Sequence, residues 1–285
     1  MKIGAHVSVA ASYERAAAHA FEIGADTMQI FTSSPRSWRC SAPIPGQAAR
    51  FLDARQRLGI SPLVVHGGYL INLASADPVI RGKSVAACRG EIERALLLEA
   101  DYLVVHPGSA KGRPAEQAIE AVAAGIAEAT RGLEPRRLTL LLENTAGQGG
   151  ALGSRLEELT SIRSLAAPQT SLEIAYCLDT AHCFAAGLDF LDSLTSLGPL
   201  LVPVIHANDS RTPFGSRVDR HEQIGRGYIG EKAFRRILTH PALATKAFIL
   251  ETPVEEDGDD ARNIETLKRL CRKSRTTRTR SNQSG

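Results

Sequence analysis

The sequence has no long apolar run and no leader-like N-terminus. No apolar segment approaches the roughly 18 residues that a membrane-spanning helix needs. The first residues, MKIGAHVS, lack the apolar stretch and the small-residue cleavage site of a secretory signal. These absences argue against a membrane protein or a secreted protein, and they predict a soluble chain in the cytoplasm.

Paired cysteines are also missing. The five cysteines form no C-x-x-C motif and are odd in number, which suits free thiols in a reducing compartment. They are Cys40, Cys88, Cys177, Cys183 and Cys271. Cys177 and Cys183 stand near Asp179 and are conceivable soft metal ligands. Small core-filling residues are the better interpretation, because a buried free cysteine behaves as a small hydrophobe.

Most of the chain has no excess of basic residues. Residues 268–285 contain seven Lys or Arg and no acid, which leaves 27 bases and 31 acids, a net −4, for the rest. Enzymes that act on nucleic acids usually carry an excess of basic residues, and this part of the chain carries a small excess of acidic ones. The last dozen residues are polar and lack apolar periodicity. We therefore predict a disordered basic tail at 270–285, which would add nonspecific affinity for phosphate.

Short apolar runs alternate with helical patterns in residues 1–269. The predicted strands are Lys2–Ser8, Thr27–Phe31, Leu63–His66, Tyr102–His106, Thr139–Glu143, Ala175–Asp179, Val202–His206 and Phe248–Glu251. The predicted helices include Tyr13–Ile23, Gln47–Leu58, Lys83–Glu99, Ala115–Thr130, Leu156–Leu165 and Lys232–Leu238. This alternation predicts a single-domain α/β protein, and eight strands favour a closed (β/α)₈ TIM barrel. The acidic stretch Glu255–Asp260 is predicted to be a solvated loop.

Six of the eight predicted strands end on a residue type that binds metals. The endings LVVH, LVVH, LLLE, YCLD, PVIH and FILE place His66, His106, Glu143, Asp179, His206 and Glu251. In a parallel barrel the carboxyl ends of the strands form the active-site face. A single histidine at such a position is more often structural, but six endings of this kind are very unlikely as coincidence. We expect these side chains to converge on one mouth.

Two loops add three more candidate ligands. In CLDTAHCFAAG, His182 follows Asp179 by three residues at a strand-to-helix junction. In SRVDRHEQIG, Asp219 and His221 are two residues apart and share one side of an extended backbone. Imidazoles and carboxylates suit Zn²⁺ or Mn²⁺. One zinc ion uses about four ligands, so nine candidates predict two or three ions that share bridging carboxylates.

A cluster of ions predicts hydrolysis of a phosphate ester. Neighbouring ions lower the pKa of a shared water toward ~7, align it for in-line attack and stabilise the leaving oxygen. Three divalent ions with four carboxylates leave a site of about +2, so the ions rather than a basic surface would attract the anion. The substrate does not follow from this reasoning.

Several segments resemble a known family. GAHVS, VVHGGYLINLAS, VHPGS, LLENTAGQGGALG, CLDTAHCFAAG, HANDS, FGSRVDRHEQIGRGYIG and ILETP resemble, in order and spacing, the signatures of the endonuclease IV family of apurinic/apyrimidinic (AP) endonucleases. The resemblance implies a xylose-isomerase-like TIM barrel with three zinc ions, Mn²⁺ being an alternative at one site. It implies a monomeric DNA repair enzyme that acts on double-stranded DNA. Such an enzyme cleaves the phosphodiester 5′ to an abasic site, leaves a 3′-hydroxyl and removes 3′ blocking groups.

The resemblance also implies how the ligands divide among the ions. His66, His106 and Glu143 would hold the first ion, and Glu143 would bridge to a second ion held by Asp179, His206 and Glu251. His182, Asp219 and His221 would hold the third. Glu143 and Glu251 are thereby the expected catalytic carboxylates. A hydroxide between the first two ions would attack phosphorus, and the third ion would neutralise the departing 3′-oxygen.

The loop after the second strand, FTSSPRSWRC, matches the family loop at Phe31, Thr32, Arg36 and Trp38. The resemblance implies DNA contacts by Arg36, Trp38, Tyr69 and Leu70. Of these, Arg36, Tyr69 and Leu70 align with residues that enter the duplex where the lesion is flipped out. Packing of the mouth wall is the alternative for Tyr69 and Leu70. The chain departs from the family at Ser33, Ser34 and Ser37, and DRHEQIG lacks a second histidine common in relatives, which Glu222 replaces.

Two other functions stay open. A sugar isomerase or epimerase of the same barrel superfamily would place metal ligands at the same strand ends, but it would not need the third set or the loop Phe31–Trp38. A noncatalytic DNA-binding protein that uses its basic tail would leave the converging ligands unexplained. His6, at the end of the first strand, is expected to lie beside the metal ligands.

Overall fold

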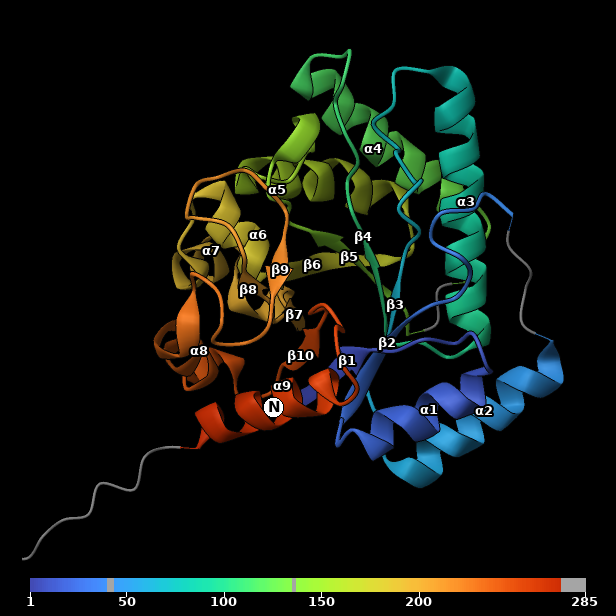
Figure 1. Ribbon diagram of the computed structural model, residues 1–285. Helices are drawn as coiled ribbons and strands as arrows, with labels where there is room; N and C mark the ends of the chain where they lie inside the picture. Colours follow the sequence, from blue (N-terminus) through green and yellow to red (C-terminus); the bar gives the residue numbers. More distant parts are fainter. Residues whose placement is uncertain (40–43, 135–136, 273–285) are drawn as a thin grey trace, which may run out of the picture.

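A computed structural model describes residues 1–39, 44–134 and 137–272, and these form a closed barrel of parallel strands surrounded by helices (Figure 1). The barrel strands are β1 (Lys2–His6), β2 (Thr27–Phe31), β3 (Leu63–His66), β4 (Tyr102–Val105), β5 (Thr139–Glu143), β6 (Glu173–Asp179), β7 (Val204–His206) and β10 (Ala247–Leu250). Their order around the barrel is β1, β10, β7, β6, β5, β4, β3 and β2. The predicted (β/α)₈ barrel is therefore confirmed.

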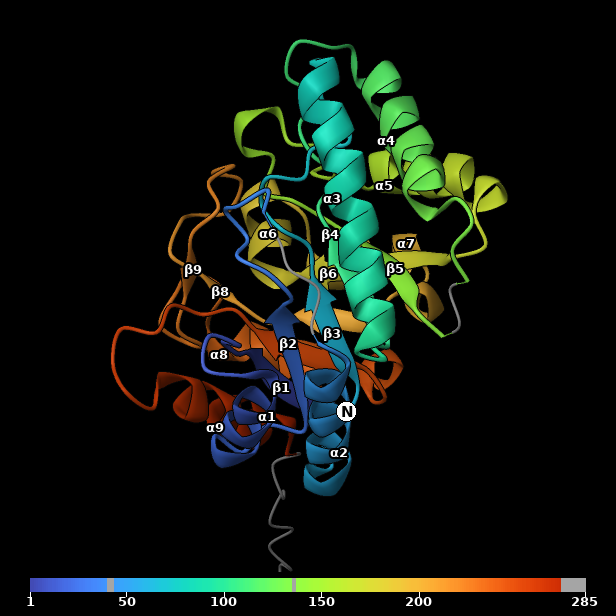
Figure 2. The same cartoon turned by 90° about the vertical axis from the view of Figure 1, so that its right-hand side faces the viewer.

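Helices follow the strands and cover the outside of the barrel. They are α1 (Tyr13–Glu22), α2 (Pro45–Leu58), α3 (Pro78–Leu97), α4 (Ala115–Thr130), α5 (Leu156–Ala166), α6 (Thr180–Ala186), α7 (Phe190–Leu197), α8 (Gly230–Leu238) and α9 (Asp259–Cys271). Short 3₁₀ turns occur at Gln148–Gly150, Ala167–Gln169, Pro199–Leu201 and Pro241–Leu243. Figure 2 shows α1 beside α2, and α3 beside α4. Among the helices of the described chain, none is both long and apolar enough to cross a membrane.

Helix boundaries follow local capping chemistry. The carboxylate of Asp77 accepts hydrogen bonds from the backbone N–H groups of Val79 and Ile80, and Pro78 occupies the first position of α3. These residues satisfy or remove N–H groups that the helix itself leaves unpaired. Helix α2 ends at Gly59, whose φ of 69° is the left-handed conformation that glycine adopts without strain.

The barrel interior is a layer of small and medium apolar side chains. It consists of Val64, Val104, Leu141, Ala175, Cys177, Val204, Ala247 and Ile249, all buried. Each of the six strand-end metal candidates lies two residues after a member of this layer. Because strand side chains alternate with a period of two, the candidates point to the same inner side as the layer below them. The apolar layer thus forms the floor of the mouth.

The expectation of a solvated loop at Glu255–Asp260 is wrong at its end. Asp259 and Asp260 form the first turn of α9, and Asp259 is buried. The carboxylate of Asp259 accepts hydrogen bonds from the backbone N–H groups of Glu255 and Glu256. Acidic side chains are favourable at a helix N-terminus, so this acidic run begins a helix instead of staying in solvent. Helix α9 continues to Cys271, and residues 273–285 of the predicted tail lie outside the described residues.

Candidate metal centre

The nine candidate ligands lie together at the carboxyl ends of the barrel strands. Six come from the ends of β3, β4, β5, β6, β7 and β10, one from α6, one from the loop before β9 (His221–Glu222) and one from β9 itself. Three overlapping groups have ligand atoms within 4.8 Å of one another. They are His66 with Glu143 and His206, then Asp179 with His182 and His221, then Glu143 with Asp179, His206 and Glu251. His106 and Asp219 contact members of these groups.

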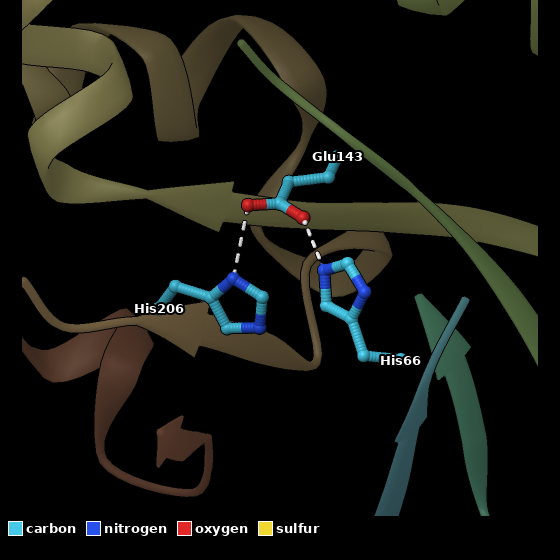
Figure 3. Close-up of side chains that lie close together, drawn as sticks. All are labelled: His66, Glu143 and His206. Carbon is cyan, nitrogen blue, oxygen red and sulfur yellow. Dashed lines mark hydrogen bonds and ion pairs between the residues drawn. The ribbon is translucent and has the colours of Figure 1, made fainter. Parts of the chain in front are cut away.

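Glu143 is the central side chain of the cluster (Figure 3). It is fully buried, and its Oε1 lies 2.9 Å from Nδ1 of His206. Its Oε2 lies 3.2 Å from Nε2 of His66 and 2.9 Å from Nε2 of His106. The two oxygens therefore face different histidines on two sides. A carboxylate in this position can bridge two ions.

The second part of the cluster is built around Asp219. Its Oδ2 lies 3.2 Å from Nε2 of His182, and its Oδ1 lies 3.4 Å from Nε2 of His221. The buried Nε2 of His221 has no hydrogen-bond partner among the described residues, and Oδ2 of Asp179 lies 3.7 Å away. An orphaned imidazole nitrogen that faces two carboxylates fits a cation better than it fits a hydrogen bond.

Local structure fixes Asp179 and His182. Asp179 ends β6 and is also the N-cap of α6, so its Oδ1 accepts the backbone N–H of His182 at 2.8 Å. The other oxygen, Oδ2, accepts a hydrogen bond of 2.7 Å from the amide of Asn208 and faces the cluster. Asn144 accepts the backbone N–H of Asp179. These bonds hold the carboxylate in one orientation before any ligand binds.

A small antiparallel ribbon brings Asp219 and His221 over the mouth. Strand β8 (Asp209–Ser210) pairs with β9, with Ser210 opposite His221. Nδ1 of His221 lies 3.1 Å from the carbonyl oxygen of Glu251, which ties the ribbon to the end of β10. The returning loop thus places two ligands beside strand ends that are distant in sequence.

The charges of the cluster shift several pKa values. Burial raises the pKa of the Glu143 carboxyl, but the nearby charges of His206 and His106 outweigh burial and hold this pKa well below its ordinary value. Burial lowers the pKa of His206, yet Cys177 and the carboxylates of Glu251 and Glu143 raise it well above the usual 6.5. Burial also lowers the pKa of His182, and the carboxylates around that ring raise it well above 6.5. Burial raises the pKa of the Asp219 carboxyl, but His182 and His221 outweigh burial and lower this pKa to about 2. The carboxylates of Glu143 and Asp219 are therefore ionised, and they favour the positively charged form of the histidines that they contact.

The two cysteines of the site region are buried thiols. Burial raises the pKa values of Cys177 and Cys183 to about 12, so neither thiol is ionised at neutral pH. Cys177 belongs to the apolar floor, and Sγ of Cys183 lies 3.3 Å from the amide nitrogen of Asn144. Both positions agree with the core-filling interpretation. Cys40 lies outside the described residues.

Two polar residues from strands without a strand-end ligand complete the site. His6 is at the end of β1, with its Nδ1 3.5 Å from Oε1 of Glu251, as expected beside the ligands. Gln29 of β2 is fully buried and contacts both Glu251 and His206. Sequence reasoning missed Gln29, although a glutamine inside the apolar run MQIF was a usable signal, because buried amides need partners.

Of the predicted DNA-contacting residues, Tyr69 lies beside the cluster, with its ring centroid 6.3 Å from that of His66. Tyr69 is 59% exposed, and its ring packs edge-on against Phe31 with centroids 5.2 Å apart. Arg36 and Trp38 are exposed, and Leu70 is half-buried. A hollow of about 430 Å³ between His106, His182 and Asp219 is lined also by Gln148, Arg220 and neighbouring loop residues, and opens beside the cluster.

A buried ion pair anchors the loop that carries Arg36 and Trp38. Glu91 and Arg94 of α3 are both buried, with Oε1 and Nη2 2.9 Å apart. Nε of Arg94 donates to Oγ1 of Thr32 at 2.7 Å, and Oγ of Ser33 donates to Glu91 at 3.3 Å. The start of the loop is therefore fixed to α3. Ser33 takes part in this anchoring through its hydroxyl.

Glu222 lies beside the third ligand set but turns away from it. Its Oε2 accepts a hydrogen bond of 2.9 Å from Nε of Arg211, and Arg211 also pairs with Glu255. Burial raises the pKa of Glu222, but a backbone hydrogen bond and Arg211 lower it below its ordinary value. Glu222 belongs to none of the three groups with convergent ligand atoms.

Known proteins resemble this chain in sequence and in fold. Residues 17–273 match the family model of the xylose isomerase-like TIM barrel. The chain is 54% identical to a Solibacter usitatus protein called probable endonuclease 4, over 95% of this chain and 97% of that protein. It is similar to endonuclease IV from Thermus thermophilus, with a TM-score of 0.83 and 38% identity over 95% of this chain and 98% of that one. A D-tagatose 3-epimerase-like protein, 21% identical over 95% of this chain and 97% of that one, shares the fold at a TM-score of 0.71.

Proposed function

Because the chain belongs to the endonuclease IV family of xylose isomerase-like TIM barrels, we propose that it is a DNA repair nuclease that acts at abasic sites. The reaction is hydrolysis of the phosphodiester 5′ to the lesion, which leaves a 3′-hydroxyl, and the same site removes 3′ blocking groups. The observation that supports this proposal most directly is the buried Glu143, whose two oxygens face different histidines.

The donor set fits three divalent ions, with zinc as the proposed metal and Mn²⁺ as an alternative at one site. His66, His106 and Glu143 would hold one ion, and Glu143, Asp179, His206 and Glu251 a second. His182, Asp219 and His221 would hold the third. When bound, these ions supply a water of lowered pKa and positive charge for the phosphate oxygens. The orphaned nitrogen of His221 supports the third set.

The chain's own residues fix the charge of the site and limit its contact with water. The carboxylate of Glu143 is buried and that of Glu251 is partly buried. Both have a pKa well below the ordinary value, so they do not take up a proton at neutral pH and they keep the ligands at a fixed separation. The apolar floor keeps bulk water away from the inner side of the cluster.

Double-stranded DNA with an abasic site is the proposed partner. The scissile phosphate can reach a recessed cluster only if the damaged nucleotide leaves the helix. Arg36 and Tyr69 are exposed and Leu70 is half-buried, and these three side chains would fill the gap, while Trp38 would support the loop from outside. A flipped abasic nucleotide is small, which suits the hollow beside Asp219.

Incubation with a duplex oligonucleotide that contains one tetrahydrofuran abasic analogue tests this function. The metal-loaded protein should cut 5′ to the analogue, leave an end that a polymerase can extend, and lose this activity in a chelator. An undamaged duplex of the same sequence is the control. Absence of metal-dependent incision would reject the proposed function, and about one bound ion per chain would favour a sugar isomerase.

A further inference from the structure

Gln29 makes three hydrogen bonds at the inner edge of the metal cluster. Its side chain is fully buried in β2, a strand that supplies none of the nine ligands. Its Oε1 lies 2.9 Å from Nε2 of His206, and its Nε2 lies 2.6 Å from Oε1 of Glu251. The same nitrogen lies 3.0 Å from Nδ1 of His6. One amide therefore joins strands β1, β2, β7 and the end of β10.

The oxygen of Gln29 determines which nitrogen of His206 carries a proton. An amide oxygen can only accept a hydrogen bond, so Nε2 of His206 must donate. In the neutral imidazole, which is the form that binds a metal, this leaves Nδ1 as the nitrogen with the lone pair. That Nδ1 lies 2.9 Å from Oε1 of Glu143 and 3.2 Å from Oε2 of Glu251. A proton on Nδ1 can occupy the space between this nitrogen and the two carboxylate oxygens, and a divalent cation can replace that proton.

The nitrogen of Gln29 orients Glu251. The amide N–H groups donate to Oε1 of Glu251 and to Nδ1 of His6, so both donors are used. Because Oε1 is occupied, Oε2 is the oxygen left to face Nδ1 of His206. The amide thus acts on two ligands of the same group, one through its oxygen and one through its nitrogen.

We propose that Gln29 is a positioning residue that fixes the tautomer of His206 and the orientation of Glu251 for a divalent cation held with Glu143 and Asp179. This inference rests on the metal-binding part of the proposed function. A hydrogen bond to the outer nitrogen of a ligating histidine strengthens metal binding, and loss of such a partner typically weakens it about 10- to 100-fold.

Thr27 offers a matched control on the same strand. It is fully buried like Gln29, and its hydroxyl donates a hydrogen bond of 2.6 Å to the carbonyl oxygen of Pro62, away from the ligands. Thr27→Val therefore removes a buried hydrogen bond from β2 without touching the cluster. If Gln29 served only to stabilise the strand, Gln29→Leu and Thr27→Val would have the same effect on metal affinity.

The test compares wild type, Gln29→Leu, Gln29→Glu and Thr27→Val by zinc titration against a competing chelator. Gln29→Leu should bind one ion about 10- to 100-fold more weakly, and the remaining ions as the wild type does. Gln29→Glu keeps an acceptor for His206 but places a carboxylate against Glu251, so it should also bind one ion more weakly. Thr27→Val should bind all ions like the wild type.

Histidine ring nitrogen NMR of the zinc-loaded proteins gives a second readout. His206 should bind zinc through Nδ1 and carry its proton on Nε2 in the wild type, in Thr27→Val and in Gln29→Glu. In Gln29→Leu, the proton of His206 should no longer be confined to Nε2, so the single wild-type pattern should be absent. The proposal is overturned if Gln29→Leu keeps both wild-type affinity and the wild-type pattern, or if Thr27→Val weakens zinc binding as much. Failure of the wild type to incise abasic DNA would reject the proposed function but leave these comparisons intact.

Discussion

Nδ1 of His206 lies 2.9 Å from Oε1 of Glu143, although β7 and β5 are separated in the barrel by β6. The contact crosses the inside of the mouth, above the apolar floor. It brings together an imidazole whose pKa is raised and a carboxylate whose pKa is lowered. Each group stabilises the charged form of the other, and a metal ion can take the place of the proton between them.

Removal of the central carboxylate should abolish activity and metal binding together. In Glu143→Ala, the histidines on both sides lose their shared partner, so we expect fewer bound ions per chain. Incision of abasic duplex should fall by more than about 100-fold, because both metal positions of the proposed mechanism depend on this residue. Metal analysis of the purified variant and its incision rate measure the two effects. Glu173→Gln, at the exposed start of β6, is the control and should resemble wild type. A fully active Glu143→Ala protein would remove the basis of the assignment.

Zinc binding by the metal-free protein should release protons at neutral pH. The pKa values of His182 and His206 are raised above the usual 6.5, which favours the protonated form of both rings in the metal-free protein. A metal ion must displace these protons, and its apparent affinity should therefore rise as the pH increases toward the folded-state pKa values of the two histidines. Calorimetry in buffers of different ionisation enthalpy measures the release. Binding without any proton release at pH 7 would contradict the protonated state.

The same shifts predict how the stability of the metal-free protein depends on pH. Because the folded-state pKa values of the two histidines exceed the unfolded value, their stabilisation is complete below about pH 6.5 and is lost as the pH rises through the folded values. We expect the melting temperature of the metal-free protein to fall toward alkaline pH relative to that of the zinc-loaded protein. Equal pH profiles for the two forms would argue against this linkage.

Tyr69 should matter more for internal lesions than for damaged 3′ ends. An exposed ring on the rim would stack in the gap left by a flipped nucleotide, and base–aromatic stacking contributes about 1–3 kcal/mol. Tyr69→Ala should therefore raise KM for an internal abasic site by about 10-fold, with a smaller effect on 3′-phosphate removal. Phe21→Ala, which removes an exposed ring on α1, is the control. Unchanged KM in Tyr69→Ala would favour plain wall packing.

Glu91 should affect DNA binding through the loop that it anchors. Glu91→Gln removes the buried negative charge that faces Arg94, and breaking a buried pair costs about 3–5 kcal/mol. We expect a lower melting temperature and a several-fold higher KM for abasic duplex, with kcat little changed. On the same helix, Glu93→Gln breaks only the exposed pair with Arg89 and should cost at most about 1 kcal/mol. A variant of Glu91 with wild-type melting and KM would show that the loop holds its position without this pair.

Much of the centre could be predicted from the sequence because strand ends carry positional information. Leu63–His66 and Thr139–Glu143 were predicted with the bounds that the structure has. Once the barrel is recognised, the period of two and the common direction of the strands place His66 and Glu143 at one mouth. The same reasoning failed at Asp259, because a carboxylate that caps backbone N–H groups looks in sequence like any exposed acid.

The sequence by itself determined the order of strands and helices, the inward side of each strand and the residue types that gather at the mouth. These properties depend on local periodicity and on chain direction. Only the tertiary structure decided that Gln29 lies against His206 and Glu251, that Glu91 and Arg94 fasten the loop at Thr32, and that Glu222 turns toward Arg211. Most of these contacts join residues that are far apart in the chain, and the contact of Glu222 depends on which side-chain rotamer it adopts. A local sequence pattern contains no information about either.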